Sequence, residues 1–129
     1  MIKIYKTPAE IIEACTLALK NRLYVSGWQL SRRLVEARRT AALEKAYGRL
    51  FSNFKIALKF IHGVPVAISL HDPMYHPTVM AFCAVAHRRN GYAAGCVNAL
   101  QLDGKFTASI GLEHSRSLWK KFGISRFAI

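Results

Sequence analysis

The feature that most constrains this chain is the run TVMAFCAVA, Thr78–Ala86, which is apolar at odd and even positions alike. Successive side chains of a β-strand point to opposite faces of the sheet, so this run predicts a central strand that is covered on both faces. Other parts of the chain must then supply helices for both faces. The run is also much shorter than the about 20 apolar residues that a membrane-crossing helix needs.

Two helices are predicted in the first part of the chain, after a short alternating strand at 1–6 (MIKIYK). The first spans about 8–23, because Thr7 and Glu10 have the spacing of a capping box and apolar residues follow at helical intervals. The second spans about 26–47 and begins with a serine in the cap position. Its apolar positions recur at helical spacing, with arginines on the other sides.

In the middle of the chain, apolar and polar residues again alternate with a period of two, as in a β-strand. This pattern predicts an antiparallel hairpin with strands at 54–60 and 64–70 and a turn at His62-Gly63. The elements expected after the central strand are a helix of small residues at 94–102, a strand at 105–112, a short helix at 113–122 and a last strand at 124–129. This order predicts one α/β (α+β) domain over residues 1–129. Its twisted sheet should be mixed and largely antiparallel, with helices on both faces.

The charge of the chain is strongly unbalanced, with 19 lysines and arginines against 7 acidic residues and a net charge of +12. A field of that sign attracts polyanions, which leaves a phosphorylated cofactor, a nucleic acid and an acidic protein surface as candidate partners. The three cysteines lie in apolar surroundings without disulfide or zinc spacing, so we expect reduced thiols and a cytoplasmic protein. No signal peptide or membrane span is indicated, and a homodimer stays open.

The segment HRRNGYAAG, His87–Gly95, follows the central strand directly and leads into a helix. The first N–H groups of a helix have no internal partner and carry partial positive charge. Gly91 allows an anion to approach the backbone, and Arg88 and Arg89 add bidentate donors. The segment therefore predicts a seat for a diphosphate group. It fits neither the glycine pattern of dinucleotide-binding folds nor the phosphate loop of nucleoside triphosphatases.

The hexapeptide RRNGYA, Arg88–Ala93, resembles the Arg/Gln-x-x-Gly-x-Gly/Ala loop of the GNAT superfamily of N-acetyltransferases. The segment SRSLWKKFGI, 115–124, is similar to the closing helix of that family. The predicted order of elements also matches over essentially the whole chain. The resemblance implies acetyl-CoA or CoA as ligand and an amine-bearing acceptor, on a small molecule or a protein, as substrate.

The resemblance also implies which residues contact the cofactor. The backbone of Arg89, Asn90, Gly91, Tyr92 and Ala93 would hold the pyrophosphate, with Arg88 or Arg89 reaching its oxygens. The strand end at Ala84, Val85 and Ala86 would pair with the pantetheine arm as an added strand does.

The chain departs from the family at the positions that usually assist the chemistry. Trp119 stands where the family has a tyrosine that protonates the leaving thiolate, and an indole N–H is only a hydrogen-bond donor. Trp119 is thus expected to contact the cofactor sulfur rather than to act as an acid. Leu112 replaces a common asparagine, and Arg89 replaces a common glycine of the loop.

A base is needed to give a neutral amine, and the candidates are Glu113, His114 and Asp72, with His71 and His76 beside them. The spacing of His71, Asp72 and His76 matches no metal site, so no metal is expected.

Two alternatives to the enzyme remain open. One is a GNAT-fold protein with little or no activity that binds CoA or a macromolecular partner, as in a bacterial or phage regulator. The other is nonspecific nucleic-acid binding through the basic helix at 26–47.

Overall fold

The computed structural model of the chain describes residues 1–24, 29–48, 53–73, 78–102, 107–109 and 127–128. Several sequence predictions lie outside the described residues: the cap at Ser26, the helix at 113–122, and most of the strands at 105–112 and 124–129. The candidate site residues His76, Leu112, Glu113, His114 and Trp119 lie outside them as well.

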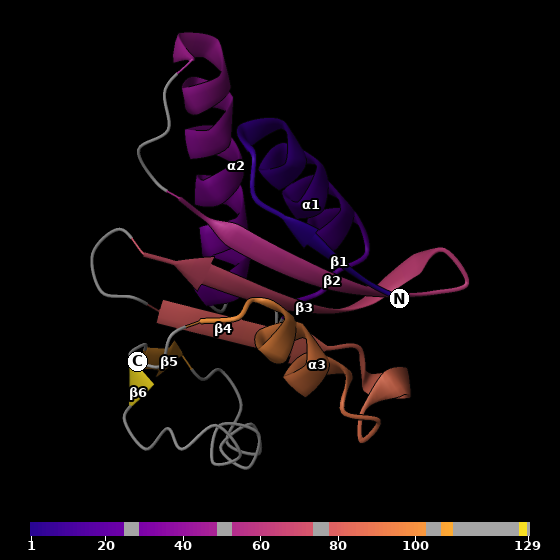
Figure 1. Ribbon diagram of the computed structural model, residues 1–129. Helices are drawn as coiled ribbons and strands as arrows, with labels where there is room; N and C mark the ends of the chain where they lie inside the picture. The colour runs from indigo at the N-terminus through magenta and orange to yellow at the C-terminus, as the bar shows by residue number, and fades with distance from the viewer. Residues whose placement is uncertain (25–28, 49–52, 74–77, 103–106, 110–126, 129) are drawn as a thin grey trace.

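Six strands form one sheet in the order of the chain (Figure 1). They are β1 (Ile2–Tyr5), β2 (Lys55–Ile61), β3 (Val64–Asp72), β4 (Thr78–Cys83), β5 (Thr107–Ser109) and β6 (Phe127–Ala128). The first four strands pair antiparallel, and β5 and β6 are added in parallel. The sheet is mixed, with an antiparallel set of four strands, as the sequence predicted.

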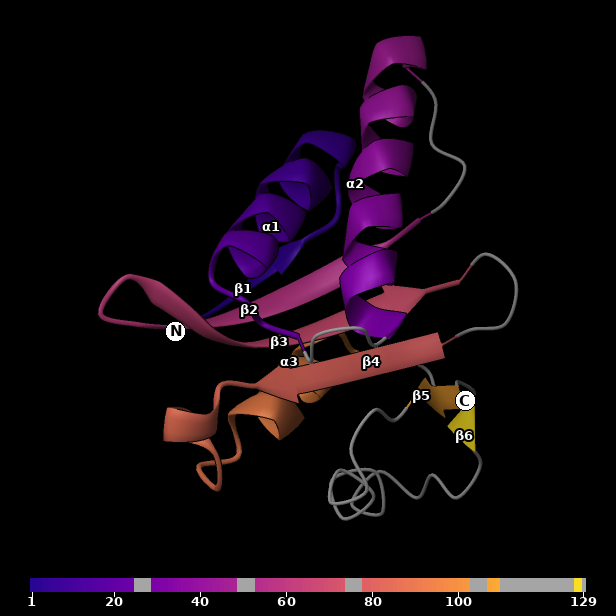
Figure 2. The ribbon, with the colours of Figure 1, turned by 180° about the vertical axis from the view of Figure 1, so that it is seen from behind.

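Helices cover both faces of this sheet, as expected from the apolar central strand. The helices α1 (Pro8–Lys20) and α2 (Gln29–Tyr47) lie on one face, and α3 (Tyr92–Ala99) lies on the other (Figures 1 and 2). The capping box of α1 is present, with Thr7 Oγ1 accepting from the N–H of Glu10. This helix ends earlier than predicted, because Arg22 takes a positive φ of 53° and the N–H groups of Arg22 and Leu23 turn back to the carbonyls of Leu19 and Ala18, as in a Schellman motif.

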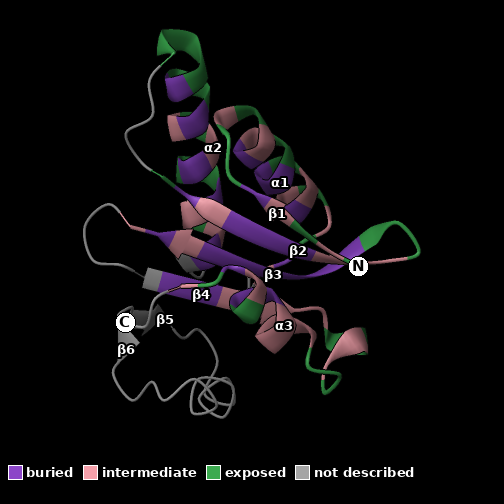
Figure 3. Cartoon of the chain, in the orientation of Figure 1, coloured by how far each residue is buried: buried purple, intermediate pink, exposed green. Residues whose placement is uncertain are grey.

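The main core lies between the sheet and the pair α1 and α2. Alternate residues of the central strands, such as Ile56, Leu58, Ile68 and Leu70, point to this face and are buried. Figure 3 shows the corresponding buried stripes on both helices. This alternation is why the hairpin could be recognised from its period of two.

The opposite face of the sheet is lined by small side chains, which bring α3 close. Ala57, Ala67 and Ser69 lie under the helix and are fully buried. A Cβ atom on Gly95 would stand only 3.2 Å from Ile2 Cδ1. The Ser69 hydroxyl donates to the Cys96 carbonyl at 2.8 Å and so satisfies a carbonyl near the end of α3.

The β2–β3 hairpin turns at the predicted dipeptide. Ile61 pairs with Val64, and His62 and Gly63 have φ angles of 51° and 77°, the positive values of a type I′ turn. The register shifts beside Pro65, which has no N–H for the ladder, so that Val66 becomes the extra residue of a bulge. The Val66 carbonyl instead accepts the N–H of Ala84 at 2.8 Å.

The prediction that an extended strand continues through Ala84, Val85 and Ala86 is wrong. β4 ends at Cys83, and Val85–His87 form a single 3₁₀ turn. The His87 N–H bonds to the Ala84 carbonyl at 2.9 Å and closes this turn. Val85 is 74% exposed, so its apolar character does not reflect burial in the sheet.

Candidate functional site

The N-terminus of α3 presents backbone amides without a capping side chain. Gly91 is the cap residue, at φ 74°, and among the described residues no side-chain cap bond is present at this end of the helix. The first helical bond runs from the Gly95 N–H to the Gly91 carbonyl at 2.9 Å. The amides of Tyr92, Ala93 and Ala94 therefore precede the first helical bond and are available to an acceptor.

The approach to these amides is open on the side of Gly91. A Cβ atom built on Gly91 would meet no atom of the described chain within 4 Å. The positive φ angle is one that residues with a side chain adopt only with strain. The loop thus combines a left-handed backbone with free space, the two properties that let a bulky anion reach a helix N-terminus.

Two cations lie near the first turn of α3, which contains no acidic residue. Arg89 is exposed two residues before Gly91 and also has a positive φ, 69°. The Lys59 ammonium of β2 lies 5.0 Å from the centroid of the Tyr92 ring. The charges of Arg89 and Lys59 add to the partial positive charge of the helix end and favour an anion there.

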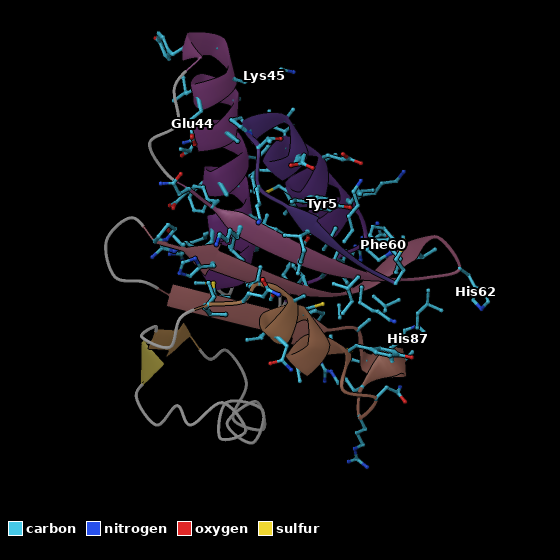
Figure 4. The ribbon with its side chains drawn as sticks, viewed as in Figure 1. Tyr5, Glu44, Lys45, Phe60, His62 and His87 are labelled. Atoms are coloured by element: carbon cyan, nitrogen blue, oxygen red, sulfur yellow. The ribbon has the colours of Figure 1, made fainter. Side chains whose placement is uncertain are left out.

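Arg88 also has a structural role. Its Nε donates to the Cys83 carbonyl at 3.0 Å, and its guanidinium carbon lies 5.5 Å from the centroid of the Phe82 ring. Asn90 holds the other side of the loop, because its side-chain amide donates to the carbonyl of His87 at 3.0 Å. Figure 4 shows His87 at the same end of the molecule as His62 in the hairpin turn. These bonds fix the backbone path that leads into α3.

The edge of β4 that faces β5 is paired over only part of its length in the described chain. Thr78 and Val79 pair with β5, whereas β3 pairs with β4 along the whole strand to Cys83. Figure 2 shows β5 beside the start of β4 and α3 beneath its end. Alternate residues of a strand direct N–H and C=O groups to each edge, so the second half of β4 offers backbone groups to an extended ligand.

Of the predicted catalytic candidates, Asp72 lies within the described residues, and its carboxylate is engaged in an ion pair. It is only 7% exposed, and its Oδ2 lies 3.1 Å from Nη1 of Arg33 on α2. This pair ties α2 to the end of β3. Arg33 also lies 3.7 Å from Glu36. Asp72 therefore helps to fix the position of α2 relative to the end of β3.

The neighbouring His71 is half-buried on β3, and its Nδ1 has no hydrogen-bond partner among the described residues. Burial lowers the pKa of this imidazole and the nearby Lys55 charge lowers it further, against an opposing effect of Asp72. A lowered pKa keeps the ring neutral at neutral pH, the form that can accept a proton.

The three cysteines are free thiols. Burial raises the pKa of Cys15 and of Cys96 to about 12, and it also raises the pKa of the half-buried Cys83. Thiolates, the nucleophilic form, are thereby disfavoured at neutral pH.

Lys59 of β2 lies near the loop and was not identified by the sequence analysis. It precedes the loop by a long stretch of chain, and only the strand register brings it to Tyr92.

Comparison with solved structures identifies the fold. The aminoglycoside N-acetyltransferase AAC(6′)-Iy, in complex with a CoA bisubstrate analogue, aligns with a TM-score of 0.58 at 13% identity, over 100% of this chain and 94% of that one. An acetyltransferase from Clostridium acetobutylicum, solved with acetyl-CoA, gives 0.54 at 12% identity, over 97% and 90%. A protein from Xanthomonas campestris assigned to the GNAT family gives 0.53 at 17% identity, over 97% and 84%.

The chain therefore has the fold of the GNAT acetyltransferases, as the loop and the element order predicted. No protein-family model matches its sequence, and no curated protein sequence matches it either. Within the described ranges, no helix has the length and apolar character needed to cross a membrane.

Proposed function

We propose that this protein is an acetyl-CoA-dependent N-acetyltransferase whose acceptor is a primary amine of a small molecule or of a protein. The observation that carries the proposal is the N-terminus of α3, which has a glycine in the cap position, open space at Gly91 within the described chain, and the cations Arg89 and Lys59 nearby. It lies at the end of β4 in a fold whose solved neighbours include complexes with CoA and acetyl-CoA.

The residues present fit a CoA diphosphate. The amides of Tyr92, Ala93 and Ala94 would donate to its oxygens, and the exposed Arg89 would add a charged donor. The pantetheine arm would lie along the free half of the β4 edge. Since a 3₁₀ turn begins at Val85, strand-like pairing would stop near Ala84, and Val85 and Ala86 would contact the arm only through their side chains. Trp119 would lie near the sulfur, as the family resemblance implies.

When bound, acetyl-CoA supplies an activated thioester, from which the acetyl group passes to the amine nitrogen and leaves CoA as the thiol. The protein must hold the amine neutral and accept its proton. Glu113 and His114 stay the proposed bases of this step from the sequence. Asp72 is the weaker candidate because its carboxylate is paired with Arg33. His71, with an unpartnered and neutral imidazole, is an additional candidate.

A second function, CoA binding without efficient turnover, is favoured by one observation. Trp119 replaces the tyrosine that usually protonates the thiolate in the family, and indole supplies no acid near neutral pH. In that case the protein would bind CoA and act through a macromolecular partner.

Calorimetry with CoA tests the binding step, and chromatography of acetyl-CoA and CoA with a panel of amines tests turnover without interference from the protein thiols. We expect binding that Gly91→Val weakens at least about tenfold, a loss of about 1.4 kcal/mol. Gly48→Val is the matched control, because Gly48 also has a positive φ, 66°, and open space around its Cβ position. It should cost similar stability and leave CoA binding unchanged.

The outcomes separate the two functions. Binding with turnover supports the transferase, and binding without turnover on any amine favours the second function. Absence of CoA binding at millimolar ligand would overturn both. Equal loss of binding in both valine variants would overturn the placement of the diphosphate at the N-terminus of α3.

A further inference from the structure

The outward face of α2 carries a line of exposed residues that no other element covers in the described chain. Five residues, which we call the outer stripe, recur at intervals of three and four: Arg32, Val35, Arg39, Ala42 and Ala46. All five are exposed, whereas the opposite face of the helix, which includes Leu34 and Ala41, is fully buried in the core.

The composition of the outer stripe is unusual for a solvated helix face. Such a face is normally polar, and intervals of three and four align residues in the seam between two packed helices. Here three of the five positions are apolar. Leu43 lies beside the stripe at 48% exposure, and Val35 is 38% exposed. The helix also extends beyond α1, with its last three residues exposed (Figures 1 and 3) and Lys45 projecting from that end (Figure 4).

The two arginines of the stripe have no acidic partner in the described chain. Among the described residues, the arginine of this helix that forms ion pairs is Arg33, which contacts Glu36 and Asp72. Arg32 and Arg39 lie two turns apart and alternate with the apolar positions. With a net charge of +12 on the whole chain, a surface of this kind attracts an acidic partner.

A second copy of the same helix is a poor occupant. In an antiparallel pair of outer stripes, Arg39 lies at the centre and would face its own copy. In a parallel pair, both Arg32 and Arg39 would face their copies. Like charges opposed in a helix seam are unfavourable, so the stripe does not complement itself. A phosphate backbone is also a poor match, because it would leave Val35, Ala42 and Ala46 without apolar contact.

We propose that the outer stripe of α2 is a docking site for an acidic amphipathic helix of a partner protein. The apolar seam of the partner packs on Val35, Ala42 and Ala46, and its carboxylates pair with Arg32 and Arg39. This site is separate from the N-terminus of α3 and does not depend on the proposed acetyltransferase activity.

The probe for this site is a synthetic amphipathic helical peptide of about three heptads, with leucines in the seam and glutamates on the flanks. A second peptide carries lysines in place of the glutamates. Fluorescence anisotropy should show binding of the acidic peptide alone, and Arg32→Glu with Arg39→Glu should weaken it at least about tenfold.

Lys20→Glu with Lys45→Glu is the matched control, because it changes the net charge equally at two exposed residues outside the stripe. It should change binding less than about threefold. A third variant, Ala42→Gln with Ala46→Gln, removes apolar contact while keeping good helix formers and every charge, and it should also weaken binding. Circular dichroism verifies that each variant is folded.

Four results would overturn the proposal. The acidic peptide does not bind, or the control pair weakens binding as much as the stripe pair. Duplex DNA binds more tightly than the peptide and loses affinity in the stripe variant. Sedimentation shows a dimer that the stripe variant dissociates.

Discussion

The first backbone N–H groups of a helix have no partner within the helix, and the N-termini of α1 and α3 differ in whether a side chain accepts from them. In α1, the Thr7 hydroxyl accepts the Glu10 N–H at 3.3 Å, and the Glu10 carboxylate accepts the N–H groups of Thr7 and Lys6 at 3.0 and 3.3 Å. In α3, the cap residue is Gly91, which has no side chain, and no acid lies in the first turn. One helix has a side-chain acceptor at its N-terminus, and the other has none within the described ranges.

The difference teaches how a stabilising feature and a binding feature can be told apart. A capping side chain stabilises a helix by about 1 kcal/mol relative to alanine but by only a few tenths of a kcal/mol relative to glycine, so the cost to α3 of having Gly91 as its cap is small. The strain of positive φ at Arg89, a residue with a side chain, adds a further local cost. Local strain beside a helix end without an acceptor of its own is expected where the amides are kept for a ligand.

The largest expected effect comes from giving α3 an acidic cap. Gly91→Asp should weaken CoA binding at least about tenfold relative to Gly91→Asn, because a carboxylate at the cap repels the diphosphate and competes for the amides. Both residues tolerate positive φ better than most. Paired calorimetry and thermal melts check this contrast.

The free energies of unfolding of Gly91→Asp and Gly91→Asn provide a second test of the comparison. Asp near a helix N-terminus is favourable by about 0.3–1 kcal/mol, so the aspartate variant should be at least as stable as the asparagine variant while binding worse. Equal CoA affinities in the two variants would mean that the amides of α3 do not face the diphosphate.

An intermediate effect is expected from removing the cap of α1. Thr7→Ala should lower the free energy of unfolding by about 1 kcal/mol and leave CoA binding unchanged. Hydrogen bonds from the Thr7 and Lys6 amides lower the pKa of Glu10. Its contribution to stability is thus present above the ordinary pKa of a glutamate and is lost as the pH falls through the lowered value.

Urea unfolding at pH 7 and at pH 3 measures both parts of this prediction. The wild type should lose the contribution of Glu10 on acidification, and Glu10→Gln should show a smaller dependence on pH. A Thr7→Ala variant that binds CoA more weakly would contradict the assignment of α1 as a purely structural element.

The smallest effect is expected at Arg89. Arg89→Gly removes the strain of φ 69° but adds the flexibility of glycine, so the net gain in stability should be less than about 1 kcal/mol. Loss of one exposed charge should weaken CoA binding by less than about tenfold. A larger loss, measured by calorimetry, would show that the guanidinium and not the backbone dominates diphosphate binding.

The fold could be predicted largely because its elements have strong local patterns. The capping box at Thr7, the alternation of the hairpin strands and the His62-Gly63 turn each specify an element within a few residues. The small residues of α3 also predicted a helix. Because the central strand is apolar on both faces, this helix was expected to cover the second face of the sheet.

The site was predictable only in part, because its remaining features depend on tertiary contacts. The strand β4 ends where the 3₁₀ turn Val85–His87 begins, which the apolar run could not reveal. Lys59 reaches Tyr92 through strand register. Arg33 occupies the Asp72 carboxylate from a helix far away in the chain. The predicted roles of Glu113, His114 and Trp119 lie outside the described residues and stay predictions.

The bond from the Ser69 hydroxyl to the Cys96 carbonyl has a consequence for the whole loop. It fastens α3 to the sheet at the end away from Gly91, on a face where small side chains leave little room to shift. Because Tyr92 and Ala99 also pack against this face, the orientation of α3, and with it the direction of its first amides, is set by the sheet beneath the helix. A substitution at the buried Ser69 is therefore expected to change the direction of those amides.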